Sequence, residues 1–239
     1  MPQINNVLLK GNTTLDALGI QAKEDGKGLS TNDFTNEYKQ KIDDLVYEKI
    51  AFTSGSATNA SNEIGSKVTE TTVSWNTNKT PKTLKIKFGS ESEETLQNTD
   101  KSKSYTGKSI TSNTNIVITA TDERDASASK TITISFQPKV YWGVSTKETL
   151  ENADILALAN SALASSKNRT FTVNAGNGEK IVYVIPSSFG TPTFNVGGFD
   201  GGFKKVQTLD FTNASGYNQN YDVWMSVNAG LGNTTVIVK

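Results

Sequence analysis

The sequence predicts a mainly β chain with few helices. Apolar residues alternate with polar ones at every second position in many short segments, as in TLKIKF at Thr83–Phe88, which is typical of strands with one buried face. Turn sequences rich in Gly and Asn separate these segments, as in NAGNGE at 174–179. One stretch near the N-terminus instead repeats apolar residues at helical spacing. These patterns divide the chain into residues 1–49, 50–138 and 139–239.

Residues 1–49 contain few core residues and one predicted helix. Ser30 and Asp33 have the spacing of a capping box, so the helix should begin near Asn32 or Asp33. Apolar residues then follow at steps of four, four and three on one face: Phe34, Tyr38, Ile42 and Leu45. A helix of about four turns is marginal alone in water, so this face needs a partner. The sequence leaves open whether that partner is another copy of the chain or the following domain.

Residues 50–138 predict a small all-β sandwich. The candidate strands are Lys49–Thr53, Thr71–Asn76, Thr83–Phe88, Asn115–Asp122 and Lys130–Phe136. Short strands at intervals of roughly ten residues are typical of an Ig-like β-sandwich. Trp75 lies on the central predicted strand and should fill the core.

Residues 139–239 predict a C-terminal β-rich domain with one helix. Helix-forming residues predict the helix over Thr149–Leu163. Strands are predicted at Arg169–Ala175, Lys180–Pro186, Val206–Asn213, Asn220–Val227 and Asn233–Lys239. The glycine pairs of GGFDGGF predict a tight loop with Phe199 and Phe203 packed inward.

Composition excludes several classes of function. Lys plus Arg and Asp plus Glu are both 24, and this neutral balance argues against a nucleic-acid-binding protein. Cys is absent, which excludes disulfides and thiolate metal sites. There is no apolar run long enough to span a bilayer and no signal peptide after Met1, so we expect a soluble protein, made in a bacterial cytoplasm, without membrane insertion.

Catalysis finds little support in the sequence. With no His and no Cys, the chain lacks histidine bases and the usual nucleophilic triads. Paired carboxylates could still hydrolyse a glycosidic bond, and the acids to consider are Asp122, Glu123, Asp125, Asp200 and Asp210. They fall in predicted turns or strand ends, where solvated charge is the simpler interpretation. We therefore expect no catalytic residues, no metal site and no cofactor.

A cluster of aromatic and amide side chains near the C-terminus suggests a sugar-binding site. Its candidate glycan-binding residues are Tyr217, Asn218, Asn220, Tyr221 and Trp224. Aromatic rings stack on the apolar faces of sugars, and amides hydrogen-bond to their hydroxyls. Because Tyr221 and Trp224 are three residues apart on one predicted strand, they face opposite sides, and one of the two should face the core. We expect the Trp224 ring to have a packing role.

Two stretches resemble bacteriophage proteins. GLSTNDFTNEYKQKIDDL, from Gly28, is similar to a linker of phage fibre and minor structural proteins, where it joins a virion-attaching N-terminus to the fibre body. The region from Val140 onward resembles a C-terminal module of phage tail and fibre proteins, above all in VYVIPSSFGTPTFNVGGFDGGF and FTNASGYNQNYDVWMS. The resemblance implies a homotrimer, with Tyr38, Ile42 and Leu45 facing a threefold axis.

The resulting hypothesis is a non-enzymatic tail or head fibre of a phage virion. Residues 1–49 would attach to other virion proteins and set the oligomeric state, and the C-terminal domain would bind a host-surface glycan. One alternative is a free carbohydrate-binding adhesin, which should be a monomer with a secretion signal. Another is a polysaccharide-degrading spike, which needs a cleft with paired carboxylates.

Overall fold

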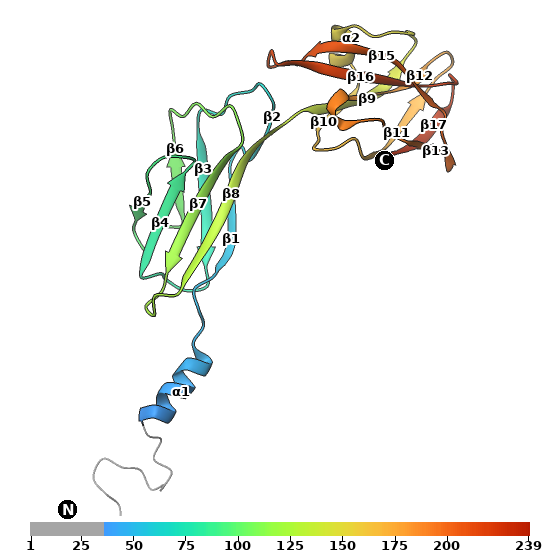
Figure 1. Cartoon of the computed structure of the whole chain (residues 1–239). Coiled ribbons are helices and arrows are strands. Elements are labelled where there is room, and N and C mark those ends of the chain that lie inside the picture. Colours follow the sequence, from blue (N-terminus) through green and yellow to red (C-terminus); the bar gives the residue numbers. More distant parts are fainter. Residues whose placement is uncertain (1–35) are drawn as a thin grey trace, which may run out of the picture. The chain divides into compact units, whose positions relative to one another are not determined.

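The computed structural model describes residues 36–239 (Figure 1). The chain divides into two compact units, Met1–Lys49 and Ile50–Lys239. Most of the described residues lie in strands, so the prediction of a mainly β chain is confirmed. Helix α1 spans Asn36–Val46, within the predicted helix, whereas the predicted start near Asn32 and the side chain of Phe34 lie outside the described residues.

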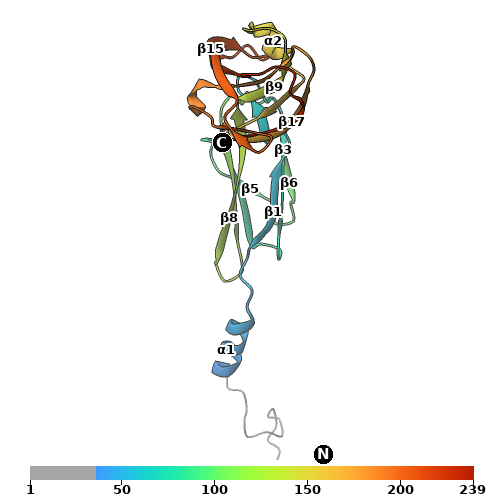
Figure 2. The same ribbon diagram turned by 90° about the vertical axis from the view of Figure 1, so that its right-hand side faces the viewer.

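The first part of the larger unit is a two-layer β-sandwich. One sheet has the order β1-β3-β6 and the other the order β2-β8-β7-β4-β5, and Figure 2 shows the two layers side by side. The strands are β1 (Phe52–Ala57), β2 (Ser61–Glu63), β3 (Thr71–Thr77), β4 (Thr83–Phe88), β5 (Glu94–Leu96), β6 (Ser102–Tyr105), β7 (Thr114–Thr121) and β8 (Ser127–Gln137). All neighbours pair antiparallel except β2 and β8, which are parallel.

The predicted alternation accounts for the core of this sandwich. Along β4, Leu84 and Ile86 are 1% exposed while the intervening lysines point outward. Trp75 on the central strand β3 is also 1% exposed, as predicted. Burying such side chains contributes about 1.5–3 kcal/mol each, which is how a chain without disulfides can stabilise this sandwich.

The C-terminal part is a second pair of packed sheets. Their orders are β10-β9-β12-β16-β15 and β11-β17-β13-β14. The strands are β9 (Lys139–Ser145), β10 (Asn160–Leu163), β11 (Arg169–Ala175), β12 (Lys180–Pro186), β13 (Phe194–Val196), β14 (Phe199–Asp200), β15 (Phe203–Thr212), β16 (Asn218–Ser226) and β17 (Gly232–Val238). Two short helical segments accompany them, α2 (Asn152–Leu156) and the 3-10 turn η2 (Ser187–Phe189).

The central strands of the five-stranded sheet are buried on both faces, whereas its outer strands β10 and β15 are largely exposed. One face packs on the four-stranded sheet through Tyr183 and Ile185 of β12 and Phe171 of β11. The opposite face packs on Ile155 of α2, and Val184 of β12 lies in that second core. Strand β12 is therefore buried throughout, which explains its continuous apolar sequence KIVYVIP.

The predicted helix over Thr149–Leu163 is mostly wrong. Only α2 is helical, and the last residues of the stretch form β10, which pairs antiparallel with β9. Leu150 is held outside the helix because the side chain of Gln207 accepts from its N–H at 3.0 Å and donates to its carbonyl at 2.6 Å. Helix propensity is a weak preference, and here pairing and side-chain contacts override it.

The prediction for the GGFDGGF loop is half right. Phe203 packs inward and stacks on Phe194, with 4.1 Å between ring centroids. Phe199 is 82% exposed. It follows a turn at Gly197 and Gly198, whose φ values of 58° and 96° favour glycine, and it pairs with Val196 at the edge of the sheet, where no further strand covers it.

A single residue, Pro138, separates β8 from β9. The side chain of Glu63, at the end of β2, is 10% exposed and contacts the first residues of β9. Its carboxylate accepts a hydrogen bond from the Tyr141 hydroxyl at 3.3 Å and pairs with Lys139 Nζ at 3.0 Å. These contacts tie β2 to the strand that begins the C-terminal part.

Candidate functional site

The apolar face of α1 is exposed. Ile42 and Leu45 lie one turn apart on the helix, whereas the side chain of the predicted assembly residue Tyr38 lies outside the described residues. Ile42, Leu45 and Val46 are 44%, 85% and 74% exposed. On the other side of the helix, Gln40 donates to Asp44 at 3.0 Å. The short helix thus presents apolar side chains on one side and a polar pair on the other.

The structure separates the predicted glycan-binding residues between the two faces of β16. Tyr221 lies in one core at 1% exposure, and its hydroxyl donates to the carbonyl of Lys139 at 2.8 Å. Burial raises the pKa of Tyr221 above its ordinary value. The prediction that Tyr221 contacts a ligand is therefore wrong, because its ring is enclosed.

Trp224 lies on the opposite face and is only partly buried. Its ring packs on Phe194 with 5.7 Å between centroids. The indole N–H is buried and has no hydrogen-bond partner among the described residues. The set that includes Tyr221 is core, and the Trp224 ring packs against a second core, which agrees with the packing role predicted for it.

Tyr217 lies in an ordered turn before β16 and is 39% exposed. The side-chain oxygen of Asn213 accepts from the N–H groups of Ser215 and Tyr217 at 2.9 and 3.0 Å. The Asn213 amide donates to the carbonyl of Ile64 in the first sandwich at 2.7 Å. A Cβ at Gly65 would lie 2.4 Å from the Cβ of Tyr217, so this turn lies directly against the loop after β2.

Asn218 and Asn220 are exposed at the beginning of β16. The amide of Asn218 donates to the Thr212 hydroxyl at 3.1 Å. Asn220 lies opposite Asp210 of β15, which is also exposed. Asn220 and Trp224 share a face of the strand because they are four residues apart.

Between Asn220 and Trp224, Asp222 forms the most connected polar cluster of this face. Asp222 is 7% exposed. Its Oδ1 accepts from the Ser187 hydroxyl at 2.7 Å and the Thr208 hydroxyl at 2.8 Å, and lies 2.8 Å from Lys205 Nζ. Three donors from η2 and β15 thus converge on one carboxylate oxygen.

These donors keep Asp222 ionised. Burial alone raises the pKa of a carboxyl group, but the hydrogen bonds from Lys205, Ser187 and Thr208 outweigh it and hold the pKa of Asp222 below its ordinary value. A carboxylate stabilised in this way accepts hydrogen bonds and does not act as a general acid near neutral pH.

The sequence interpretation missed Asp222, Lys205, Thr208 and Ser187. A signal was present, because Asp222 is a charged residue inside the otherwise apolar run of YDVWM. A charge at a buried strand position requires partners. Which residues supply them could not be inferred, since the bulge between Lys205 and Gln207 shifts the register of β15.

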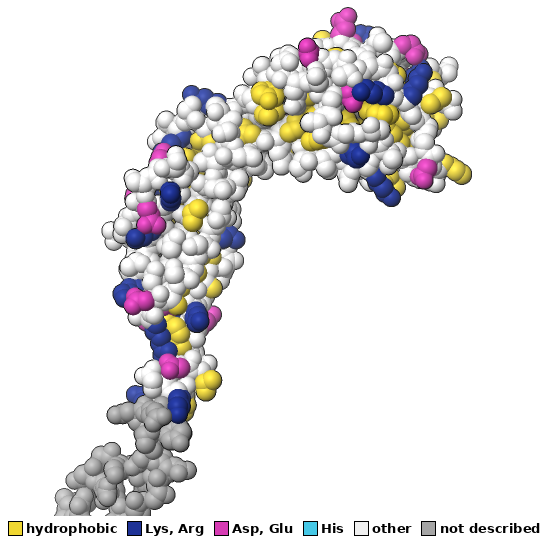
Figure 3. Space-filling view, viewed as in Figure 1, with side chains coloured by type: hydrophobic (Ala, Val, Ile, Leu, Met, Phe, Trp, Pro, Cys, Tyr) yellow, Lys and Arg dark blue, Asp and Glu magenta, His cyan; other side chains and the backbone are white. Residues whose placement is uncertain are grey.

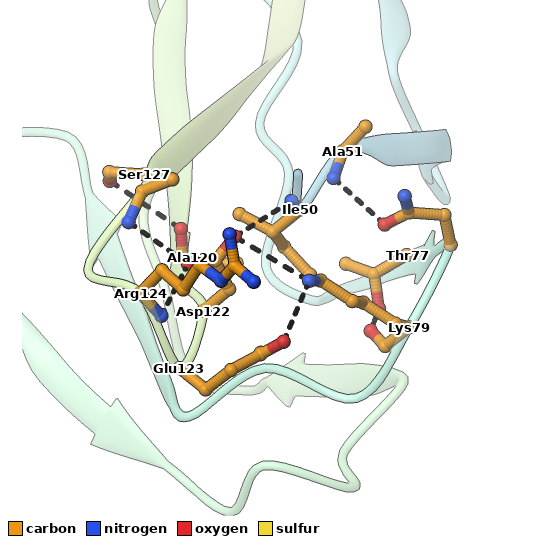
Figure 4. Close-up of polar contacts among 11 residues, drawn as sticks. Ile50, Ala51, Thr77, Lys79, Ala120, Asp122, Glu123, Arg124 and Ser127 are labelled. Atoms are coloured by element: carbon orange, nitrogen blue, oxygen red, sulfur yellow. Dashed lines mark hydrogen bonds and ion pairs between the residues drawn. The ribbon is translucent and has the colours of Figure 1, made fainter. Parts of the chain in front are cut away.

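Asp122, the first carboxylate considered for catalysis, is buried at the base of the first sandwich (Figure 4). Oδ1 accepts from the N–H groups of Arg124 and Ala126 at 3.0 and 2.9 Å. Oδ2 accepts from the N–H of Ile50 at 3.1 Å and lies 3.6 Å from Lys79 Nζ. The two oxygens of Asp122 thus connect Ile50, just before β1, to the turn between β7 and β8. Asp122 is therefore a structural residue.

Three of the other carboxylates considered for catalysis also have hydrogen-bond or ion-pair partners. Glu123 pairs with Lys79 at 3.1 Å, Asp125 pairs with Lys82 at 2.7 Å, and Asp200 accepts from Asn195 at 2.7 Å. A backbone hydrogen bond and the Lys79 ammonium lower the pKa of Glu123, the opposite of what a general acid requires. Among residues 36–239, no three His, Cys, Asp or Glu side chains are grouped to hold a metal ion.

A groove in the first sandwich is a less favourable ligand site than the cluster around Asp222. This groove of about 400 Å³ beside β3 and β6 is lined largely by hydroxyl side chains. Thr72 and Ser104 hydroxyls are 2.9 Å apart, and Thr71 donates to the carbonyl of Thr58 at 2.6 Å. Because these hydroxyls already have partners, they have less to gain from a ligand.

Charge is dispersed over the surface. In Figure 3, Lys and Arg side chains are interspersed with Asp and Glu over the face shown, without a large area of one sign. No helix within the described part of the chain is long and apolar enough to cross a membrane.

Comparison with known proteins does not assign the chain to a family. No family model matches the chain, and no curated protein matches it. Two similar solved structures are chitinase ChiA74 from Bacillus thuringiensis (10% identity, TM-score 0.24, 80% of this chain and 26% of that chain) and α-L-rhamnosidase from Dictyoglumus thermophilum (9%, 0.26, 79% and 27%). The chain spans about a quarter of the length of each. Similarity at this level carries no argument about function.

Proposed function

We propose that the chain is a non-enzymatic fibre or appendage protein of a bacteriophage virion. It assembles as a homotrimer through α1, attaches to other virion proteins through its N-terminal segment, and presents its C-terminal domain to glycans of the host surface. The single observation that carries the proposal is the exposed apolar face of α1.

The physical argument concerns the stability of this helix. The described part of α1 has 11 residues, and an isolated helix of three to four turns is at most marginally stable in water. Ile42, Leu45 and Val46 add an apolar face that gains nothing while it remains in water. Packing against the same face of other copies removes both costs.

The sequence resemblance supports the viral context. The linker-like stretch from Gly28 includes α1, and in phage fibres such a linker joins the attachment peptide to the body of a trimer. The two β-sandwiches after α1 fit the body and distal parts of an appendage, and the first has the strand spacing of Ig-like domains.

The test is the mass of the full chain in solution, measured by light scattering after size exclusion. We expect three times the chain mass of 25.7 kDa. Ile42→Asp and Leu45→Asp should each yield monomers, because a charge in the interface must be desolvated. Gln40→Asp is the matched control, since it introduces the same side chain about 200° around the helix from Ile42.

A monomeric parent chain would contradict the proposal. Trimers that persist in both Ile42→Asp and Leu45→Asp would place the assembly surface elsewhere. Equal dissociation of Gln40→Asp would show that helix stability, and not the apolar face, determines assembly.

A further inference from the structure

The edge formed by β15 and β16 carries a row of polar side chains centred on Asp222. Three cross-strand pairs make up this Asp222 row: Asp210 opposite Asn220, Thr208 opposite Asp222, and Lys205 opposite Trp224. The bonds from Thr208 and Lys205 to Asp222 place these side chains on the same face of the sheet. Strand β15 is the last strand of its sheet, so the outer edge of the row remains open.

The row combines one nearly buried carboxylate with exposed polar neighbours. Lys205, Thr208, Asp210 and Asn220 are all exposed, whereas Asp222 is 7% exposed. All protein donors to Asp222 converge on Oδ1. Oδ2 receives no hydrogen bond from the described residues. Oδ2 is not one of the fully buried side-chain atoms that lack a partner, so it reaches solvent and can accept a hydrogen bond from a ligand hydroxyl in place of water.

Charge restricts the ligand that would fit. Lys205 Nζ lies 2.8 Å from the same carboxylate and supplies its counter-charge, which disfavours a cation there. Asp222 and Asp210 together disfavour an anion. A neutral ligand with several hydroxyls avoids both penalties, because hydroxyls donate to carboxylates and accept from ammonium and amide groups.

Trp224 gives the row an apolar end. Its ring is held by Phe194, and part of it remains exposed beside Lys205. Aromatic rings contact the C–H faces of sugars while neighbouring polar groups fix the hydroxyls. Asn220, at the other end, supplies an exposed amide that can both donate and accept.

We infer that the Asp222 row binds a neutral sugar unit of a glycan. Oδ2 of Asp222 accepts from a sugar hydroxyl, Asn220 hydrogen-bonds to a neighbouring hydroxyl, and the exposed part of Trp224 contacts the apolar face. The inference rests on the proposed function, since it gives the adhesive domain its site and its class of ligand. It differs from the sequence prediction by excluding Tyr221 and by adding Asp222 from the centre of the strand.

The experiment measures binding of the full chain to an array of neutral hexose and N-acetylhexosamine oligosaccharides, with uronate-containing and phosphorylated glycans on the same surface. We expect the parent to bind neutral glycans. Asn220→Ala and Asp222→Asn should each weaken binding by about tenfold, the effect of losing one good hydrogen bond. Asn174→Ala is the matched control, because Asn174 is an exposed amide on β11 of the other sheet. It should bind like the parent.

Melting curves of all variants separate binding from folding. Asp222→Asn alters the carboxylate that binds Ser187 of η2, so this variant can lose stability. Asn220→Ala removes no such contact. If Asp222→Asn unfolds, glycan binding by Asn220→Ala tests the site. The inference is overturned if the parent binds no neutral glycan, if it prefers the acidic glycans, or if folded Asn220→Ala binds like the parent. Loss of binding in Tyr217→Ala alone would overturn it too, by placing the ligand on the turn before β16.

The mass of the same samples distinguishes this site from the proposed function. A trimer that binds no glycan refutes the site and leaves the fibre assembly intact. A monomer that binds neutral glycans through Asn220 refutes the assembly and leaves the site intact.

Discussion

At the scale of single residues, Asp122 shows how the sandwich holds a buried charge. The carboxylate is fully enclosed, and each of its oxygens faces a backbone N–H group. Charge-assisted hydrogen bonds of this kind offset the cost of desolvation. The cluster also fixes Ile50, the first residue of the larger unit, against the turn between β7 and β8.

Replacing Asp122 by Asn should lower the free energy of unfolding by about 2–3 kcal/mol. In either orientation of the amide, its NH₂ group would face a backbone N–H, of Ile50 on one side or of Arg124 and Ala126 on the other. Urea unfolding followed by circular dichroism measures the change. Asp125→Asn is the control: its carboxylate is exposed and pairs with Lys82, so its effect should stay within about 0.5 kcal/mol. Equal losses in the two variants would contradict the structural role of Asp122.

The sequence of β16 predicts the strand but not the direction in which its aromatic side chains point. The run around Tyr221 and Trp224 predicts a strand near the C-terminus, and Asn220, predicted as its first residue, is the third residue of β16 and is exposed. The faces could not be assigned, because alternation distinguishes an inner from an outer side only where one side meets water. Here Tyr221 and Trp224 meet different cores.

At the scale of elements, strands with strong alternation were predicted well. β4 and β11 have the predicted bounds, and so does β12, whose apolar run is continuous and not alternating. Five of the missed strands are short: β14 has two residues, β2, β5 and β13 have three each, and β6 has four, too few to establish a period. The false helix at Thr149–Leu163 arose from propensity alone, and the pairing that turned its last residues into β10 involves β9, which the local sequence does not reveal.

Helix α1 should be separable from the sheets. A fragment that begins at Lys49 keeps Ile50 and therefore the contact to Asp122. Because the cores of both sandwiches lie after Lys49, we expect it to retain β-sheet circular dichroism and the parent melting temperature within a few degrees. It should be monomeric by light scattering. Loss of the β-sheet signal would show that the sandwiches depend on the N-terminal unit, and a trimeric fragment would remove α1 from assembly.

At the scale of the whole molecule, buried tyrosines connect stability to alkaline pH. Burial raises the pKa of Tyr105 and Tyr183 from 10.0 to about 12, and it also raises the pKa of Tyr141 and Tyr221. The unfolded chain loses these protons near pH 10.0, whereas the folded protein retains them to higher pH. Stability should therefore be level below about pH 10 and fall as the pH rises towards 12.

Urea unfolding at a series of pH values above about 9 measures this fall. Tyr183→Phe should make it shallower by removing one of the groups, although the lost hydrogen bond to the Lys167 carbonyl lowers stability at every pH. An unchanged slope in Tyr183→Phe would contradict the assignment of the alkaline fall to buried tyrosines.

The parallel pairing of β2 with β8 bears on how the first sandwich responds to mechanical tension. A pull applied between β1 and β2 and after β8 drags β2 and β8 in opposite directions along their common axis. The pairing is flanked by backbone bonds from Ser135 N–H to the Ala60 carbonyl at 2.8 Å and from Ile64 N–H to the Gln137 carbonyl at 2.9 Å. Such bonds are loaded in shear, so they share the force and must rupture together, whereas a hairpin pulled from its open end unzips one bond at a time.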